Sequence, residues 1–167
     1  MDLTALTNTS LLGIYLNDHL AGSTAGVALI ERTAQAHEGT PAGPVLAKLA
    51  KEIAEDREDL LAFMAALEVG IAHYKLAGAW VAERAGRLKL NGRLLGRSPL
   101  SSLVELEGMK LGVEGKAAGW RSLRVLADRD SRLDSAKLDQ LLTRAKAQSR
   151  TLEKLRVAAA GQAFTDS

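Results

Sequence analysis

The stretch from Ser98 to Ala127, SPLSSLVELEGMKLGVEGKAAGWRSLRVLA, predicts one long helix with a marked start. Ser98 suits the N-cap position, and Pro99 suits the first helical position because the N–H it lacks has no partner there. Ser102 and Glu105 repeat the spacing of a capping box one turn later, so either serine is a candidate cap. At about 100° per residue, one broad apolar face is shared by Leu103, Leu106, Leu111, Val113, Ala117, Ala118 and Val125.

Charged side chains are predicted near the middle of this same face. Their spacings are three, four and seven residues, and they are Glu107, Lys110, Glu114 and Arg121. An ordinary surface helix keeps its charges on the side opposite to the apolar face. The charges on this helix therefore raise the question of a buried polar site.

The composition favours one helical domain. The chain has 167 residues, of which 47% are apolar and only 4% aromatic, so Leu, Ala, Val and Ile must fill the core. The absence of cysteine excludes disulfides, thiolate metal sites and cysteine nucleophiles, and it suits a cytoplasmic protein. A net charge of +2 is too small to imply a polyanion as partner.

Neither a secretory signal nor a membrane span is expected. A signal peptide needs an early basic region, whereas the first basic residue is Arg32. The apolar run over residues 11–30 is interrupted by Asn17, Asp18 and His19, and a span needs about 20 mostly apolar residues.

Hydrophobic periodicity and turn residues predict an all-α, antiparallel four-helix bundle with an additional shorter helix before a basic loop. We expect the first two helices to form a hairpin around a short turn at 37–44, and Gly70 and Gly161 to mark helix ends. Gly22 and Gly26 lie one turn apart and predict the close approach of a neighbouring backbone. The predicted helices span residues 10–36, 45–69, 71–88, 99–127 and 135–160.

Polar residues interrupt the apolar faces of four helices near their midpoints, where the helices of an antiparallel bundle meet. They are His19, then Asp56 with Arg57, then Glu107, Lys110 and Glu114, then Gln148 with Ser149. This layout resembles the ferritin-like superfamily, and the Ala-, Leu-, Arg- and Gly-rich composition is consistent with a bacterial protein from a high-GC genome. The resemblance implies carboxylates and histidines at mid-height, so His19, Asp56, Glu107 and Glu114 stand where metal ligands would stand.

Two interpretations of this layer follow. The ferritin-like resemblance allows Fe, Mn or Zn, but the Glu-x-x-His pairs of a di-iron site are absent, since Leu16, Ala34 and Gly70 lie three residues before the three histidines. A structural layer of ion pairs is favoured instead, because the acids are matched in number by Arg57, Lys110 and Arg121.

A second candidate site is a basic stretch that leads into the long helix. It contains Arg84, Arg87, Lys89, Arg93 and Arg97, and it could bind phosphate, an acidic lipid headgroup or nucleic acid at the helix N-terminus. A solvated loop, or one paired with the acids of residues 52–59, is the favoured interpretation.

Catalytic motifs are missing from the sequence: it has no G-x-S-x-G, P-loop or H-E-x-x-H spacing. The sequence therefore predicts a non-enzymatic interaction or structural bundle that associates with itself or with a protein partner. Small-residue faces, or the sides that carry Trp80 and Trp120, are the expected contact surfaces.

Overall fold

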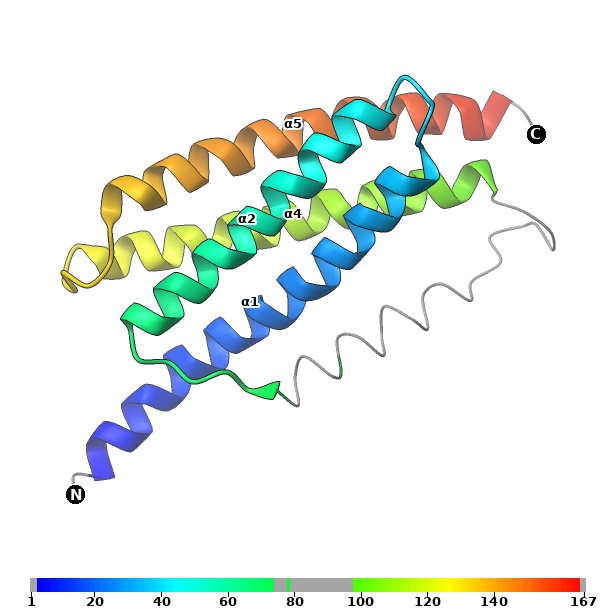
Figure 1. The fold of residues 1–167 in the computed structure, drawn as a ribbon. Coiled ribbons are helices and arrows are strands. Elements are labelled where there is room, and N and C mark those ends of the chain that lie inside the picture. Colours follow the sequence, from blue (N-terminus) through cyan, green and yellow to red (C-terminus); the bar gives the residue numbers. More distant parts are fainter. Residues whose placement is uncertain (1–2, 74–77, 79–97, 166–167) are drawn as a thin grey trace.

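The computed structural model describes residues 3–73, 78 and 98–165, and within these ranges the chain is all-helical, without strands. Figure 1 shows the labelled helices packed along one another. They are α1 (Leu3–Ala36), α2 (Gly43–Ala66), α4 (Pro99–Ala127) and α5 (Ser135–Thr165). No described helix combines the length and the apolar character that a membrane span requires. The predicted fold class, an all-α four-helix bundle, is confirmed.

The start and end of α4 agree with the predicted range of 99–127. Ser98 has extended backbone angles, φ −75° and ψ 143°, and its Oγ accepts a hydrogen bond from the N–H of Leu100 at 3.2 Å. Pro99 follows in the first turn. Of the two candidate serines, Ser98 is therefore the cap.

Other helix ends differ from the predictions. α1 begins at Leu3, before the predicted residue 10, and α2 ends at Ala66. Glu68, with a positive φ of 58°, lies in the turn that ends α2, a function that the sequence assigned to Gly70. α5 continues through Gly161 to Thr165, because a single helical glycine costs only about 1 kcal/mol.

The predicted helix at 71–88 falls mostly outside the described residues. Residues 71 and 72 are not helical, whereas His73 and Gly78 are. Trp80 also lies outside the described part of the chain.

Cross-helix contacts give the direction of each helix pair. Residue numbers rise along one helix as they fall along the other, so the two run in opposite directions. This holds for α1 and α4 (Tyr15–Ser122, Thr33–Glu105, His37–Ser102), for α4 and α5 (Lys110–Glu153, Arg124–Asp139), and for α2 and α5 (Glu52–Gln148, Asp59–Lys137).

α1 and α2 also run in opposite directions, because a short turn joins them and they lie side by side in Figure 1. The predicted hairpin is thereby confirmed. α2 and α4 consequently run in the same direction, so the chain leaves α2 at one end of the bundle and enters α4 at the other.

Two apolar clusters fill the bundle. One includes Leu20, Phe63 and Trp120, and the other includes Ile53, Val113 and Leu152. Along α2 the first cluster begins at Leu60 and the second ends at Ile53, so the residues between them lie where the two clusters meet. The candidate functional site occupies this level.

The helix contacts that need glycine differ from those predicted. A Cβ added at Gly22 or Gly26 would meet no atom within 4 Å among the described residues, so neither marks a close approach there. A Cβ at Gly119 would instead lie 3.0 Å from Cε1 of His19, and one at Gly43 would lie 2.7 Å from the carbonyl oxygen of His37. The close approaches are therefore α4 to the His19 ring and α2 to the preceding turn.

Candidate functional site

Asp56 is the centre of a buried polar network. It lies on α2 with only 1% of its surface exposed, and its two carboxylate oxygens are held from two other helices. Lys116 of α4 donates a hydrogen bond to Oδ2, whereas Oδ1 forms an ion pair with Arg144 of α5 and accepts no hydrogen bond from a described residue. Gln148 of α5 donates from Nε2 to Oδ2 at 3.1 Å. One buried carboxylate thus links three helices.

Gln148 connects this centre to a second acid. Its Oε1 accepts a hydrogen bond from Lys116 Nζ at 2.7 Å, and its Nε2 also donates to Glu52 Oε2 at 3.2 Å. With 1% of its surface exposed, Gln148 uses both ends of its amide inside the bundle. Burial lowers the pKa of Lys116 by penalising its charged form, while Asp56 partly offsets this by favouring the ammonium ion.

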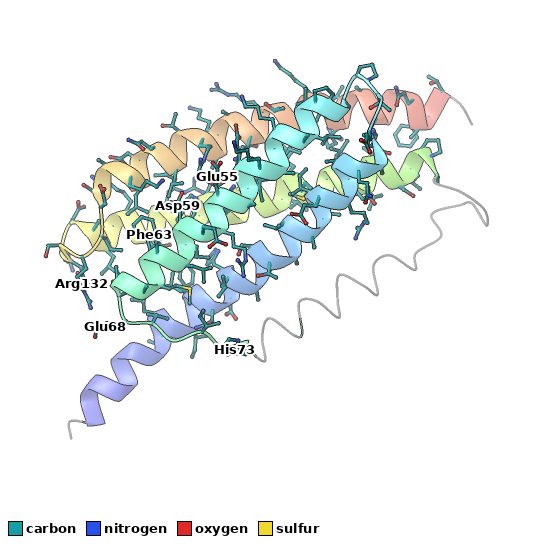
Figure 2. All side chains as sticks on the ribbon, viewed as in Figure 1. Glu55, Asp59, Phe63, Glu68, His73 and Arg132 are labelled. Atoms are coloured by element: carbon teal, nitrogen blue, oxygen red, sulfur yellow. The ribbon has the colours of Figure 1, made fainter. Side chains whose placement is uncertain are left out.

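Arg144 extends the network towards solvent. Its guanidinium reaches Glu55 at 3.2 Å and Asp59 at 3.1 Å, and Lys137 also binds Asp59 at 3.0 Å. Figure 2 shows Glu55 and Asp59 along the side of α2 that faces α5. One side of the network is therefore open to water, whereas Asp56 is closed off.

Charges in the network are balanced. Four acids of α2 contact four basic side chains: the acids are Glu52, Glu55, Asp56 and Asp59, and the bases are Lys48, Lys116, Lys137 and Arg144. A cation site normally keeps an excess of negative charge, and each oxygen of Asp56 already binds a cationic group. The arrangement is suited to holding helices in register.

Glu107 and Glu114 do not belong to this buried network, contrary to the sequence-based prediction, because both are exposed. Glu107 binds Arg156 of α5 at 3.4 Å, and Glu114 accepts a hydrogen bond from Ser149 at 2.6 Å. The predicted partner Arg121 is exposed as well.

Lys110, also a predicted partner, instead binds Glu153 at 3.3 Å. Two hydrogen bonds from Arg156, at 2.9 and 2.8 Å, are the main reason that the pKa of Glu153 falls to about 2. These contacts form a solvated seam between α4 and α5.

His19 and Arg57 lie near α4 and α1 but do not bind Asp56. The ring of His19 packs edge-on against Tyr15, with 4.5 Å between the ring centroids, and lies against Gly119. Partial burial lowers the pKa of His19, and the nearby charge of Asp18 opposes this effect. Arg57 donates to Thr24 at 3.1 Å and to Glu58 at 2.9 Å.

Lys116 was not predicted because the expected apolar face of α4 lies too far to one side, and Arg144 was not predicted because its pairing depends on how α2 and α5 are aligned. Leu111 and Val125, which the expected face included, are 73% and 70% exposed. The buried face follows Leu103, Leu106, Met109, Val113, Ala117, Trp120 and Leu123. Lys116 lies three residues after Val113 and four before Trp120, and this spacing is the signal that could have identified it.

Two of the predicted sites gain no structural support. Among the described residues, no three His, Asp or Glu side chains come close enough together to hold a metal ion. The basic residues Arg84, Arg87, Lys89, Arg93 and Arg97 lie outside the described ranges.

Comparison of the chain with protein-family models, with curated proteins and with solved structures finds no match. The function is therefore argued from the network and the surface of the bundle.

Proposed function

We propose that this chain is a non-enzymatic helical bundle that acts by associating with proteins, including copies of itself. The observation that carries the proposal is that each oxygen of Asp56 lies in an ion pair. Lys116 and Gln148 hold Oδ2, and Arg144 is paired with Oδ1, so the carboxylate joins three helices. A carboxylate that ligates a metal or transfers a proton to a substrate needs an oxygen free for that purpose.

A structural role for the network explains its position. Buried ion pairs add little net stability, but a buried charge that loses its partner is strongly destabilising. A bundle whose helices slip out of register would separate these pairs and would therefore be much less stable. Asp56, Lys116 and Gln148 lie between the two apolar clusters, where they can fix the relative heights of α2, α4 and α5. The rigid framework would then present its outer faces to a partner.

The connectivity supports a ferritin-like assignment as part of this proposal. Ferritin-like bundles have one long crossover between parallel helices, and here the chain between α2 and α4 joins opposite ends of the bundle. The missing Glu-x-x-His pairs favour a member that uses the bundle for association. The lack of cysteine supports placing the protein in the cytoplasm.

Sedimentation velocity and cross-linking of the purified full chain, with affinity capture from its native cell extract, test the proposal. We expect either a defined oligomer or a specific, salt-resistant partner. A protein that stays monomeric at all concentrations and captures nothing would contradict the proposal. Near-stoichiometric Fe, Mn or Zn that is lost in Asp56→Asn would contradict the structural role of the network.

A further inference from the structure

The outer face of α4, opposite its buried face, carries apolar and small residues where a surface helix usually carries charges. Val104, Leu111 and Val125 are exposed to 38%, 73% and 70%, and Ala118 of the same row is exposed. The four lie seven residues apart, so they form one row along the helix. We call them the outer row.

A second row of small residues runs beside the outer row. Gly108, Gly115 and Ser122 alternate with it at spacings of three and four residues. All three are exposed, although Gly108 and Ser122 also border α1, at Leu29 and Tyr15. Together the two rows reproduce the pattern by which one helix packs along another in a coiled coil. A Cβ added at Gly115 would meet no atom within 4 Å among the described residues, so the surface is open there.

If two copies of α4 run in opposite directions, the residues of one outer row meet those of the other in pairs of matching size. When two such helices lie antiparallel about a two-fold axis level with residues 114 and 115, Leu111 meets Ala118 of the second copy. Val104 then meets Val125 of the second copy. Gly115 of the second row, which lies at the level of the axis, permits a close approach of the two helices. The row is therefore self-complementary in shape, as a two-fold interface requires.

Charges along the α5 edge of the outer row favour the same arrangement. Glu107 lies opposite Arg121 of the second copy, and the symmetry repeats this pair. Arg121 is exposed and makes no ion pair with any described residue, and among the same residues Glu107 binds only Arg156, at 3.4 Å. In a parallel arrangement the α5 edge would instead face the opposite edge of the row, where Gly112 carries no charge and Gly119 is buried against His19.

One like-charge pair remains, since Glu114 lies near Glu114 of the second copy. Its Oε1 accepts a hydrogen bond from Ser149 of α5, which directs the carboxylate away from the outer row. We propose that the outer row of α4 is the interface of an antiparallel homodimer, held by Glu107–Arg121 pairs across the two-fold axis. This inference rests on the proposed function and identifies the surface and the partner.

Sedimentation equilibrium of the full chain tests the interface. We expect a reversible dimer that Leu111→Glu weakens by at least about tenfold, because a charge replaces the central apolar contact. Val157→Glu is the matched control, since Val157 is 55% exposed on α5, and it should leave the dimer unchanged. Circular dichroism establishes that each variant is folded.

A charge exchange keeps the test valid if Leu111→Glu does not fold. Glu107→Arg and Arg121→Glu should each weaken the dimer by about threefold or more, and the double variant should restore it. Glu114→Gln should tighten the dimer. If the chain forms an oligomer whose dissociation constant is changed neither by Leu111→Glu nor by the charge exchange, this interface is wrong but the proposed function stands. A monomeric chain that captures another protein would also overturn only the interface, whereas a monomer without any partner would overturn both.

Discussion

His19 of α1 lies directly against Gly119 of α4. A Cβ at Gly119 would be 3.0 Å from Cε1, 3.1 Å from Nδ1 and 3.3 Å from Nε2 of the ring. Edge-on packing against Tyr15 also restrains the ring, and Tyr15 itself is hydrogen-bonded to Ser122 of α4 at 2.9 Å. The spacing of α1 and α4 at this level is therefore set by the absence of a side chain at residue 119.

Gly119→Ala should destabilise the protein by about 1–3 kcal/mol, because the new methyl group displaces a restrained ring and overpacks the contact. Gly161→Ala is the matched control. It places a methyl group on an equally helical glycine with no atom within 4 Å, and it should stabilise the protein by up to about 1 kcal/mol. Urea denaturation measures both changes. Equal effects of the two substitutions would show that the contact with His19 carries no cost.

The stability of the protein should fall as the pH drops below about 6.5, with His19 as a main contributor. Burial lowers the pKa of His19 in the folded state below its ordinary value of 6.5, so the unfolded chain takes up the proton first. Stability is therefore fully present above pH 6.5 and is lost between that pH and the folded-state pKa. Denaturation curves at successive pH values should show a smaller loss in His19→Gln.

Two observations separate the contribution of His19 from that of other groups that gain a proton as the pH falls. The exposed His73 offers the control His73→Gln, which should keep the loss of the wild type. Asp130 and Glu153 have pKa values of about 2, lowered by Arg132 and Arg156, so their contribution is lost only below about pH 4.5. An unchanged pH profile in His19→Gln would contradict the assignment.

Asn17 of α1 forms hydrogen bonds with the segment of chain that comes after α2, and these bonds hold that segment against α1. Its Nδ2 donates to the carbonyl oxygens of Gly13 and Gly70 at 2.8 and 2.9 Å, and its Oδ1 accepts from the N–H of Ala72 at 2.6 Å. Asn17→Leu leaves two backbone groups of residues 70–72 without these partners and should cost about 2–3 kcal/mol. Limited proteolysis should detect faster cleavage near residue 70, whereas the exposed Gln35→Leu should not change it.

Short sequence patterns, such as an N-cap residue followed by proline, predicted the positions of the helices well. Ser98 and Pro99 together predict a start at residue 99, and α4 begins there, although Ser102 was an alternative cap in the sequence. Gly161 was misleading because the cost of one glycine is small compared with the packing of a long helix such as α5. Local sequence thus locates a helix more reliably than it locates its last turn.

The orientation of α4 was less predictable because the helix has apolar residues on two sides. Leu111 and Val125 lie outside the core, and including them moved the expected face away from Lys116. Asp56 and Gln148 were correctly placed in a buried polar layer, since each interrupts an otherwise unambiguous apolar face. The pairing of Asp56 with Arg144 depends on how α2 and α5 are aligned, which single-helix periodicity does not contain.

The Asp56 network should behave as a unit in which the loss of the acid is the most costly change. Asp56→Ala leaves the mostly buried Lys116 without its acidic partner and Arg144 without one of its three acids, and it should destabilise the protein by about 3–5 kcal/mol. Lys116→Met should cost much less, because Asp56 keeps Arg144 and Gln148 while the buried ammonium ion is removed. The solvated Lys110→Met, which removes a pair with Glu153, should change stability by at most about 1 kcal/mol.

The double variant Asp56→Ala with Lys116→Met completes a thermodynamic cycle. It should be less destabilised than the sum of the two single variants, because removing Lys116 also removes one of the charges that Asp56→Ala leaves unpaired. Chemical denaturation of all four proteins gives the coupling energy, which we expect to exceed about 1 kcal/mol. Strict additivity would mean that Asp56 and Lys116 contribute independently. The network would then not fix the register of α2 and α4, and the structural role assigned to Asp56 would have to be abandoned.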